Sequence, residues 1–284
     1  MKTKKYFYGS LSSVALLPLI VWTSPVATLP LGEAQLARSR AFDEPLVPIG
    51  GHRTARENRA LGRALAAYEA RADSDDTSAI TGFLQANASS VWRASLLTNL
   101  GSAYRRTGRF SNALEAWNET WKLAKNEEDL QARAVGDRAL GELSDLTARL
   151  GHQEALEKLL EEVGDRDVRG PGSERLLAAR EALWQMRREP EDSFRCGPCA
   201  LSKVSEANWP NHPRSTEILN ARATPRGTSL HQLGALADKF QMSPRAAKRQ
   251  PGAAVPVPSV MHWKQGHSAI RTSVRNGLST GSPR

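Results

Sequence analysis

One stretch of the chain, residues 91–123, has a spacing that restricts the fold more than any other feature. Its apolar and small residues recur every three or four positions, the spacing of one face of an α-helix. A Thr107-Gly108 turn signal divides the stretch, so we predict two helices that fold back on each other. Small residues let the helices approach closely, while aromatic rings fill the space beside them. The residues are Leu97, Leu100, Gly101 and Tyr104 before the turn, and Ala113 and Trp117 after it.

The order of these residues resembles the tetratricopeptide repeat, with Leu-Gly and Tyr on the first helix and Ala and an aromatic on the second. The resemblance implies stacked helical hairpins that offer a surface to a protein partner. A degenerate second copy follows at residues 143–160. Gly108 and Gly151 lie 43 residues apart, whereas this repeat has a period of about 34. We therefore expect an irregular array.

Helical spacing extends to both sides of this hairpin, so we predict a helical-repeat domain over residues 56–188. A last helix is expected from Glu174 to about Arg187, because Pro190 cannot continue it. Three tryptophans lie on the apolar faces of these helices and are expected to fill the core rather than to bind a cofactor. They are Trp92, Trp117 and Trp121.

The N-terminus carries a targeting pattern. Three lysines among the first five residues precede an apolar stretch of 12 residues, positions 11–22, which is shorter than the about 20 that a membrane span needs. We predict that residues 1–27 are a signal peptide or an N-terminal anchor and that the protein is exported. Residues 28–55 contain three prolines and the pair Gly50-Gly51 without any periodic pattern, so we predict a linker there.

The net charge of +9 is concentrated at the C-terminal end. Residues 190–284 hold 13 basic and 5 acidic residues, whereas the first 189 residues hold 26 and 25. The basic residues are scattered singly and lack the interleaved aromatic residues of a nucleic-acid-binding surface. We therefore expect no nucleic-acid partner. The 2 cysteines are too few for a disulfide framework.

Both cysteines lie in one short segment, Cys196-Gly-Pro-Cys199, and three kinds of chemistry compete for it. Cys-Gly-Pro-Cys is the dithiol motif of thioredoxins, but here no apolar strand precedes it. The two cysteines with His262 and His267 are zinc ligands by type, but 62 residues separate the two pairs, too many for a zinc finger. The third kind of chemistry is nucleophilic catalysis. A helix is expected to begin near Cys196 and to favour the thiolate form of this side chain, and His267 is expected at the start of a strand.

The third chemistry is supported by a resemblance over residues 190–270. Three groups follow one another along the chain: Cys196-Gly197 with Leu201, then Thr228-Ser229-Leu230, then Met261-His-Trp263 ahead of His267. This order resembles the papain-like cysteine peptidases that cut double-glycine leaders from bacteriocin precursors. The resemblance implies a small papain-like α+β domain in which Cys196 is the nucleophile and His267 the general base. It also implies a peptide or protein substrate and no cofactor.

Departures from that family pattern leave other functions open. An oxyanion-stabilising glutamine is missing upstream of the cysteine, where Gln185 is only a weak candidate, and no acidic residue follows His267. Members of this family often sit on ATP-using transporters, but the chain has no phosphate-binding loop, so any transporter would be a separate protein. The domain would be incomplete, and residues 271–284 are expected to be a disordered tail.

The sequence thus predicts a multidomain α+β protein, with an all-α helical-repeat array followed by a small, incomplete papain-like domain. The predicted function is that of an exported cysteine peptidase-like protein whose helical repeats bind a partner or substrate. Two alternatives remain: a non-catalytic scaffold with a degenerate peptidase domain, and a thioredoxin-like dithiol oxidoreductase.

Overall fold

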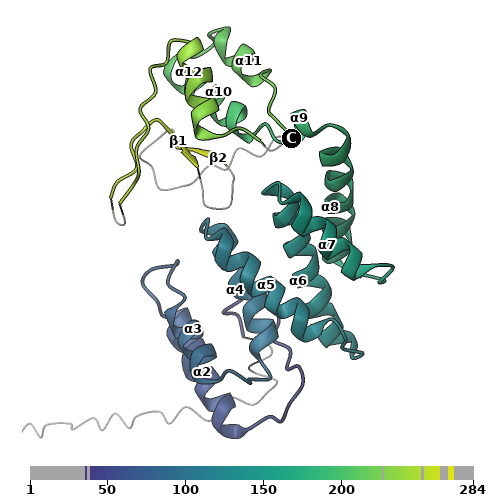
Figure 1. The fold of residues 1–284 in the computed structure, drawn as a ribbon. Helices are drawn as coiled ribbons and strands as arrows, with labels where there is room; N and C mark the ends of the chain where they lie inside the picture. Colours follow the sequence, from purple (N-terminus) through teal and green to yellow (C-terminus); the bar gives the residue numbers. More distant parts are fainter. Residues whose placement is uncertain (1–35, 37–38, 226, 251–252, 263–267, 272–284) are drawn as a thin grey trace, which may run out of the picture.

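The computed structural model describes residue 36 and residues 39–225, 227–250, 253–262 and 268–271 (Figure 1). The chain is mostly helical within these ranges. Its helices are α2 (Ala55–Glu69), α3 (Ser78–Ala86), α4 (Arg93–Arg106), α5 (Phe110–Ala124), α6 (Leu130–Arg149), α7 (Gln153–Val163), α8 (Pro171–Arg188), α9 (Pro190–Ser193), α10 (Cys196–Asn208), α11 (Arg214–Leu219) and α12 (Leu230–Lys239). Its strands are β1 (Ser259–His262) and β2 (Ser268–Arg271).

The predicted helical hairpin is present as α4 and α5. Gly101 lies directly against Trp117, since a Cβ on Gly101 would fall 2.3 Å from the indole nitrogen. The indole is fully buried and donates a hydrogen bond to the carbonyl of Thr98 at 3.1 Å. Trp92 and Trp121 are buried as well. The prediction that small residues permit a close helix crossing, and that these tryptophans are core, is therefore confirmed.

Helix α6 is the centre of the array and packs against α4, α5, α7 and α8 (Figure 1). The turns that follow α4 and α6 contain the two glycines expected there, Gly108 with a φ of +73° and Gly151 with a φ of +71°. These backbone angles suit glycine and strain other residues. The helical-repeat part predicted from the sequence is thus confirmed.

Acidic side chains are buried along α6 and are paired with arginines. Glu142 accepts a hydrogen bond from Arg105 of α4 at 2.7 Å and forms an ion pair with Arg175 of α8 at 2.8 Å. Asp145 pairs with the same Arg105 at 2.7 Å. Buried carboxylates are tolerated only when they are paired in this way. The network therefore fixes α4 and α8 on either side of α6.

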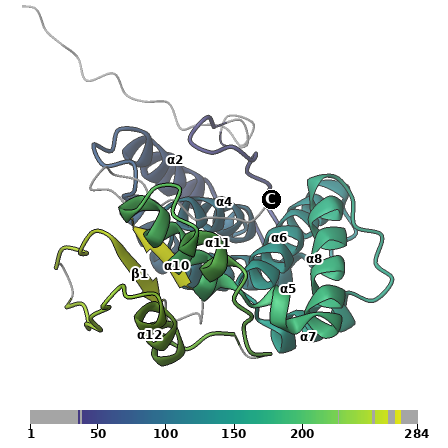
Figure 2. The same cartoon turned by 90° about the horizontal axis from the view of Figure 1, so that it is seen from above.

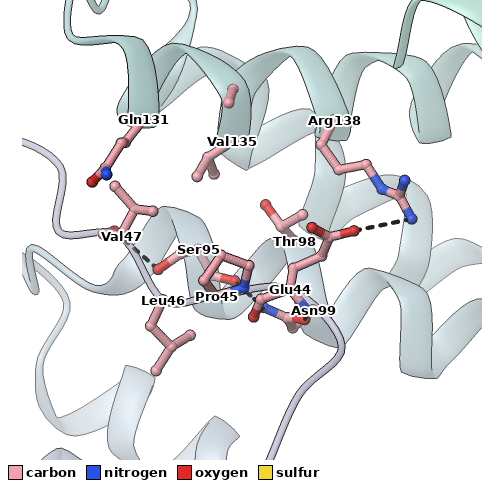
Figure 3. Close-up of a pocket in the computed structure, with 11 residues that line it drawn as sticks. Glu44, Pro45, Leu46, Val47, Ser95, Thr98, Asn99, Gln131, Val135 and Arg138 are labelled. Atoms are coloured by element: carbon pink, nitrogen blue, oxygen red, sulfur yellow. Dashed lines mark hydrogen bonds and ion pairs between the residues drawn. The ribbon is translucent and has the colours of Figure 1, made fainter. Parts of the chain in front are cut away.

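Part of the segment predicted as a linker is packed against the array. Residues 43–49, which we name the strap, have no helix or strand and run along α4 on the side that faces α6 (Figure 3). Leu46 of the strap is 2 % exposed and belongs to the main hydrophobic core. The irregular backbone was expected, but its burial was not.

The C-terminal part differs from the papain-like domain that the sequence predicts. It consists of α10, α11 and α12 with one antiparallel hairpin, β1–β2, in which His262 pairs with Ser268. The part of the chain that the structure describes contains this two-stranded hairpin and no larger sheet of the papain type. The reason is local: each strand has only 4 residues, and the residues between them and after β2 lie outside the described ranges.

The hairpin and α12 lie on the opposite side of the molecule from α8 (Figure 2). The short helix α9 leads from the array into this unit. The Val257–Pro258 peptide bond ahead of β1 is cis. No helix among the described residues is long and apolar enough to cross a membrane. The predicted signal or anchor, residues 1–27, lies outside the described residues. So does the predicted tail, residues 271–284, except for Arg271, which is the last residue of β2.

Candidate functional site

Helix α10 begins at Cys196, as the sequence predicts. Arg195 occupies the N-cap position without a side-chain cap, and Pro198 lies in the first turn, where its missing N–H is tolerated. The N–H groups of Cys196 and Gly197 lie in this first turn, where a helix leaves its donors without internal partners. Such an N-terminus stabilises negative charge on a thiolate. Cys196 is a free, half-buried thiol.

The second cysteine has a different environment. Cys199 lies one helical turn further along α10 and is also a free thiol. Burial raises the pKa of the Cys199 thiol, which opposes the lowering effect of Arg195. A raised pKa leaves less thiolate at neutral pH and therefore a less reactive sulfur.

The first two motifs of the predicted peptidase resemblance meet in space. A Cβ on Gly197 would lie 2.9 Å from the Cβ of Thr228, so only glycine lets α10 come this close to the start of α12. Ser229 then begins α12 with a capping box: its hydroxyl accepts from the N–H of Gln232, and the Gln232 side chain accepts from the N–H of Ser229. Helix α12 therefore begins directly after Thr228 and Ser229.

The β1–β2 hairpin packs against α10, so that Met261 and His262 of the third motif belong to the same unit. His262 ends β1, is exposed, and has its Nδ1 3.4 Å from the hydroxyl of Ser268. Ser268 is 5 % exposed and is the first residue of β2. His267, the predicted general base, directly precedes Ser268 in the chain but lies outside the described residues. His262 is thus an exposed residue of β1.

Two further predicted site roles gain no support. The Gln185 side chain is exposed on α8 and donates a hydrogen bond to the Glu181 carboxylate of the same helix at 3.5 Å. Among the described residues, no three Cys, His, Asp or Glu side chains gather as metal ligands. Three of the four residues considered for zinc, Cys196, Cys199 and His262, are described and therefore do not form such a group.

One aromatic residue joins this unit to the helical array. The ring of Phe194, two residues ahead of Cys196, packs against the second core cluster, which lies between α6, α7 and α8. A Cβ on Gly151 would lie 3.0 Å from that ring, and one on Gly227 would lie 3.9 Å from the Phe194 backbone carbonyl. The start of α10 is therefore held between the array and the segment that leads to α12.

A second candidate site, a pocket of about 330 Å³ between the strap and α6, was missed by sequence reasoning (Figure 3). The strap forms one wall and α4 and α6 form the others. One signal for it was present: Ser95 and Asn99 are polar residues one helical turn apart in the apolar stretch that became α4. Both are almost fully buried. The lining residues are Glu44, Pro45, Leu46, Val47, Ser95, Thr98, Asn99, Gln131, Ala134, Val135 and Arg138.

Comparison of the chain with known protein families, with curated proteins and with solved structures gave no match. The functional argument therefore rests on the geometry described above.

Proposed function

We propose that this chain is an exported cysteine peptidase-like protein that hydrolyses peptide bonds through the thiol of Cys196. The observation that carries the proposal is the placement of Cys196 at the first position of α10, with the β1–β2 hairpin packed on the same helix. The β2 strand starts at the residue after His267. A nucleophile on a helix start that faces a histidine beside a strand is the papain-type arrangement.

In the proposed reaction, the Cys196 thiolate attacks the carbonyl carbon of a peptide bond. The N–H groups at the start of α10 stabilise the oxyanion that forms. His267, as the imidazolium, gives its proton to the leaving amine as the C–N bond breaks, which leaves a thioester on Cys196. Water then attacks the thioester while His267 takes one of its protons; the C–S bond breaks, the carboxylic acid product is released, and the Cys196 thiolate and the His267 imidazolium are restored.

The remaining parts of the proposal concern export and partners. Residues 1–27 would direct the chain out of the cytosol as a signal peptide or an anchor, and the helical array at residues 56–188 would hold a substrate or a partner protein. A separate transporter could supply the substrate. Fractionation of cells for the intact chain tests this part, and recovery from the cytosol alone would overturn it.

The proposed activity is tested by peptide cleavage with matched variants of the full chain. Cys196→Ala should abolish cleavage of a mixed peptide library read by mass spectrometry, while Cys199→Ala, one turn away on the same helix, should keep it. His267→Gln should abolish cleavage, while His262→Gln should keep it. Cleavage that survives Cys196→Ala, or that is lost equally in Cys199→Ala, would refute the assignment.

A non-catalytic role for the C-terminal unit is the second candidate, and the small two-stranded hairpin favours it. In that case wild-type chain would cleave nothing, yet the helical array would still bind its partner. The dithiol oxidoreductase is less favoured, because the helix α9 precedes Cys196 where that fold needs a strand. Reduction of insulin by the wild-type chain, lost in both Cys196→Ala and Cys199→Ala, would indicate the oxidoreductase instead.

A further inference from the structure

The strap is held on α4 by contacts to its backbone. The side-chain amide of Asn99 makes two hydrogen bonds to Glu44: its oxygen accepts from the Glu44 N–H at 3.1 Å, and its nitrogen donates to the Glu44 carbonyl at 3.2 Å. One turn earlier, the Ser95 hydroxyl donates to the carbonyl of Val47 at 3.0 Å. Asn99 is 4 % exposed and Ser95 is 1 % exposed. Buried groups that satisfy the backbone of an extended segment recognise a peptide main chain.

Side chains of the strap add charge and apolar contacts. Glu44 lies 3.2 Å from Arg138 of α6, and Asp43 lies 2.8 Å from Arg106 at the end of α4. The Leu46 side chain is buried and points away from α6 (Figure 3). The surface therefore selects an extended segment that presents an acidic side chain two positions ahead of a buried aliphatic one.

The strap does not fill the space that holds it. Pro45 and Val47 line the pocket of about 330 Å³, with Gln131 and Val135 of α6 across from them (Figure 3). A segment with a larger apolar side chain in place of Val47 would fill this space and bury more apolar surface. A peptide with a larger apolar side chain at this position would therefore fit the groove more closely than the strap does.

We propose that the α4–α6 groove, lined by Ser95, Asn99 and Arg138, is a binding site for an extended segment of a separate protein, and that the strap occupies it as an internal competitor. The partner segment carries an acidic residue at the position of Glu44 and a large apolar residue at the position of Val47. This site lies within the helical array and does not depend on the chemistry of Cys196.

In this proposal the strap leaves the groove by a turn of the backbone at the glycine pair that follows it, and Leu46 leaves the hydrophobic core with it. The strap is followed by Gly50 and Gly51, whose φ angles are +65° and +59°, and no atom outside the adjacent residues lies within 4 Å of a Cβ placed on Gly50. The N-cap of α2, Thr54, lies just beyond this pair. A tethered competitor acts at an effective concentration of about millimolar, so it weakens the binding of any free peptide. The partner segment must therefore bind tightly enough to displace the strap.

The test uses the full chain and a fluorescein-labelled peptide with the sequence of residues 42–49, Phe-Asp-Glu-Pro-Leu-Val-Pro-Ile, read by fluorescence anisotropy. Leu46→Ser in the protein weakens the strap and should tighten peptide binding at least tenfold over wild type. Glu44→Ala is a second, milder strap variant and should also tighten the binding of the peptide. Asn99→Leu, added to either, should remove the gain. A probe with Val47→Phe should bind more tightly than the unaltered probe.

Circular dichroism at 222 nm confirms that each variant keeps its helices. Equal affinity of the probe for wild type and for both folded strap variants would overturn the proposal, as would a gain that Asn99→Leu does not remove. Light scattering of the wild-type chain should show a monomer. A dimer that dissociates in Leu46→Ser would show that a second copy, through strap exchange, occupies the groove instead. Cys196→Ala should bind the probe as wild type does, which separates this proposal from the peptidase.

Discussion

The contact between Gly101 and Trp117 makes a sharp prediction about stability. A Cβ on Gly101 would lie 2.3, 2.5 and 2.7 Å from three atoms of the Trp117 indole, so Gly101→Ala forces α4 and α5 apart. The ring cannot turn aside, because it is fully buried and donates to the Thr98 carbonyl.

The size of the effect follows from three contributions. Overpacking of a rigid core costs about 1–3 kcal/mol, and weakening the buried indole hydrogen bond costs about 1 kcal/mol. The better helix propensity of alanine returns about 1 kcal/mol. The free energy of unfolding should therefore fall by about 1–3 kcal/mol. With an m-value of about 2 kcal/mol/M, the urea midpoint falls by roughly 0.5–1.5 M.

The matched control is Gly82→Ala. Gly82 is an exposed residue of α3, and no atom lies within 4 Å of a Cβ placed there. This change should stabilise the chain by about 0.5–1 kcal/mol. Both variants are measured by urea unfolding followed at 222 nm at 25 °C. A midpoint for Gly101→Ala at or above that of wild type, alongside a gain for Gly82→Ala, would refute the close approach of α4 and α5.

Three further predictions concern other contacts. Gly197→Ala should lower the melting temperature of the chain, because its Cβ would lie 2.9 Å from the Cβ of Thr228; an unchanged temperature in a thermal scan would contradict that contact. Because burial raises the pKa of the Cys199 thiol, its alkylation by iodoacetamide, followed by mass spectrometry, should begin at a higher pH in the folded chain than in urea; the same onset in both would exclude the effect. The hydrogen bond from Lys125 lowers the pKa of the Glu162 carboxyl. The ionised carboxylate therefore stabilises the folded chain above the unfolded-state pKa of about 4.3. This stabilisation is lost as the pH falls through the lower folded-state pKa. Glu162→Gln should therefore cost about 0.5 kcal/mol at pH 7 and nothing at pH 2 by urea unfolding, and an equal cost at both would argue against an ionic contact.

Local sequence signals predicted the parts of the fold that depend on neighbours in the chain. The three-and-four spacing around Leu97 and Leu100 predicted α4, and the turn glycines Gly108 and Gly151 marked its end and that of α6. The start of α10 near Cys196 was also predicted correctly, because a helix start needs only the few residues that follow it.

Contacts between segments that are far apart in the chain could not be predicted from the sequence. Asn99 and Glu44 are 55 positions apart, and nothing in the irregular proline-rich strap indicated that Asn99 would hold its backbone. The close pair Gly141 and Gly172, where a Cβ on the first would lie 2.5 Å from the Cα of the second, depends on the packing of α6 against α8. The predicted papain-type sheet failed for a similar reason, since strand pairing depends on partners far away in the chain.

Phe194 connects the helical array to the C-terminal unit that begins with α10. Its ring rests on Gly151 at the α6–α7 turn, while its own backbone leads within two residues to the thiol of Cys196. A tilt of the α6–α7 turn would therefore move Phe194 and, with it, the first turn of α10, so that the packing of these helices and the position of the Cys196 sulfur are geometrically coupled.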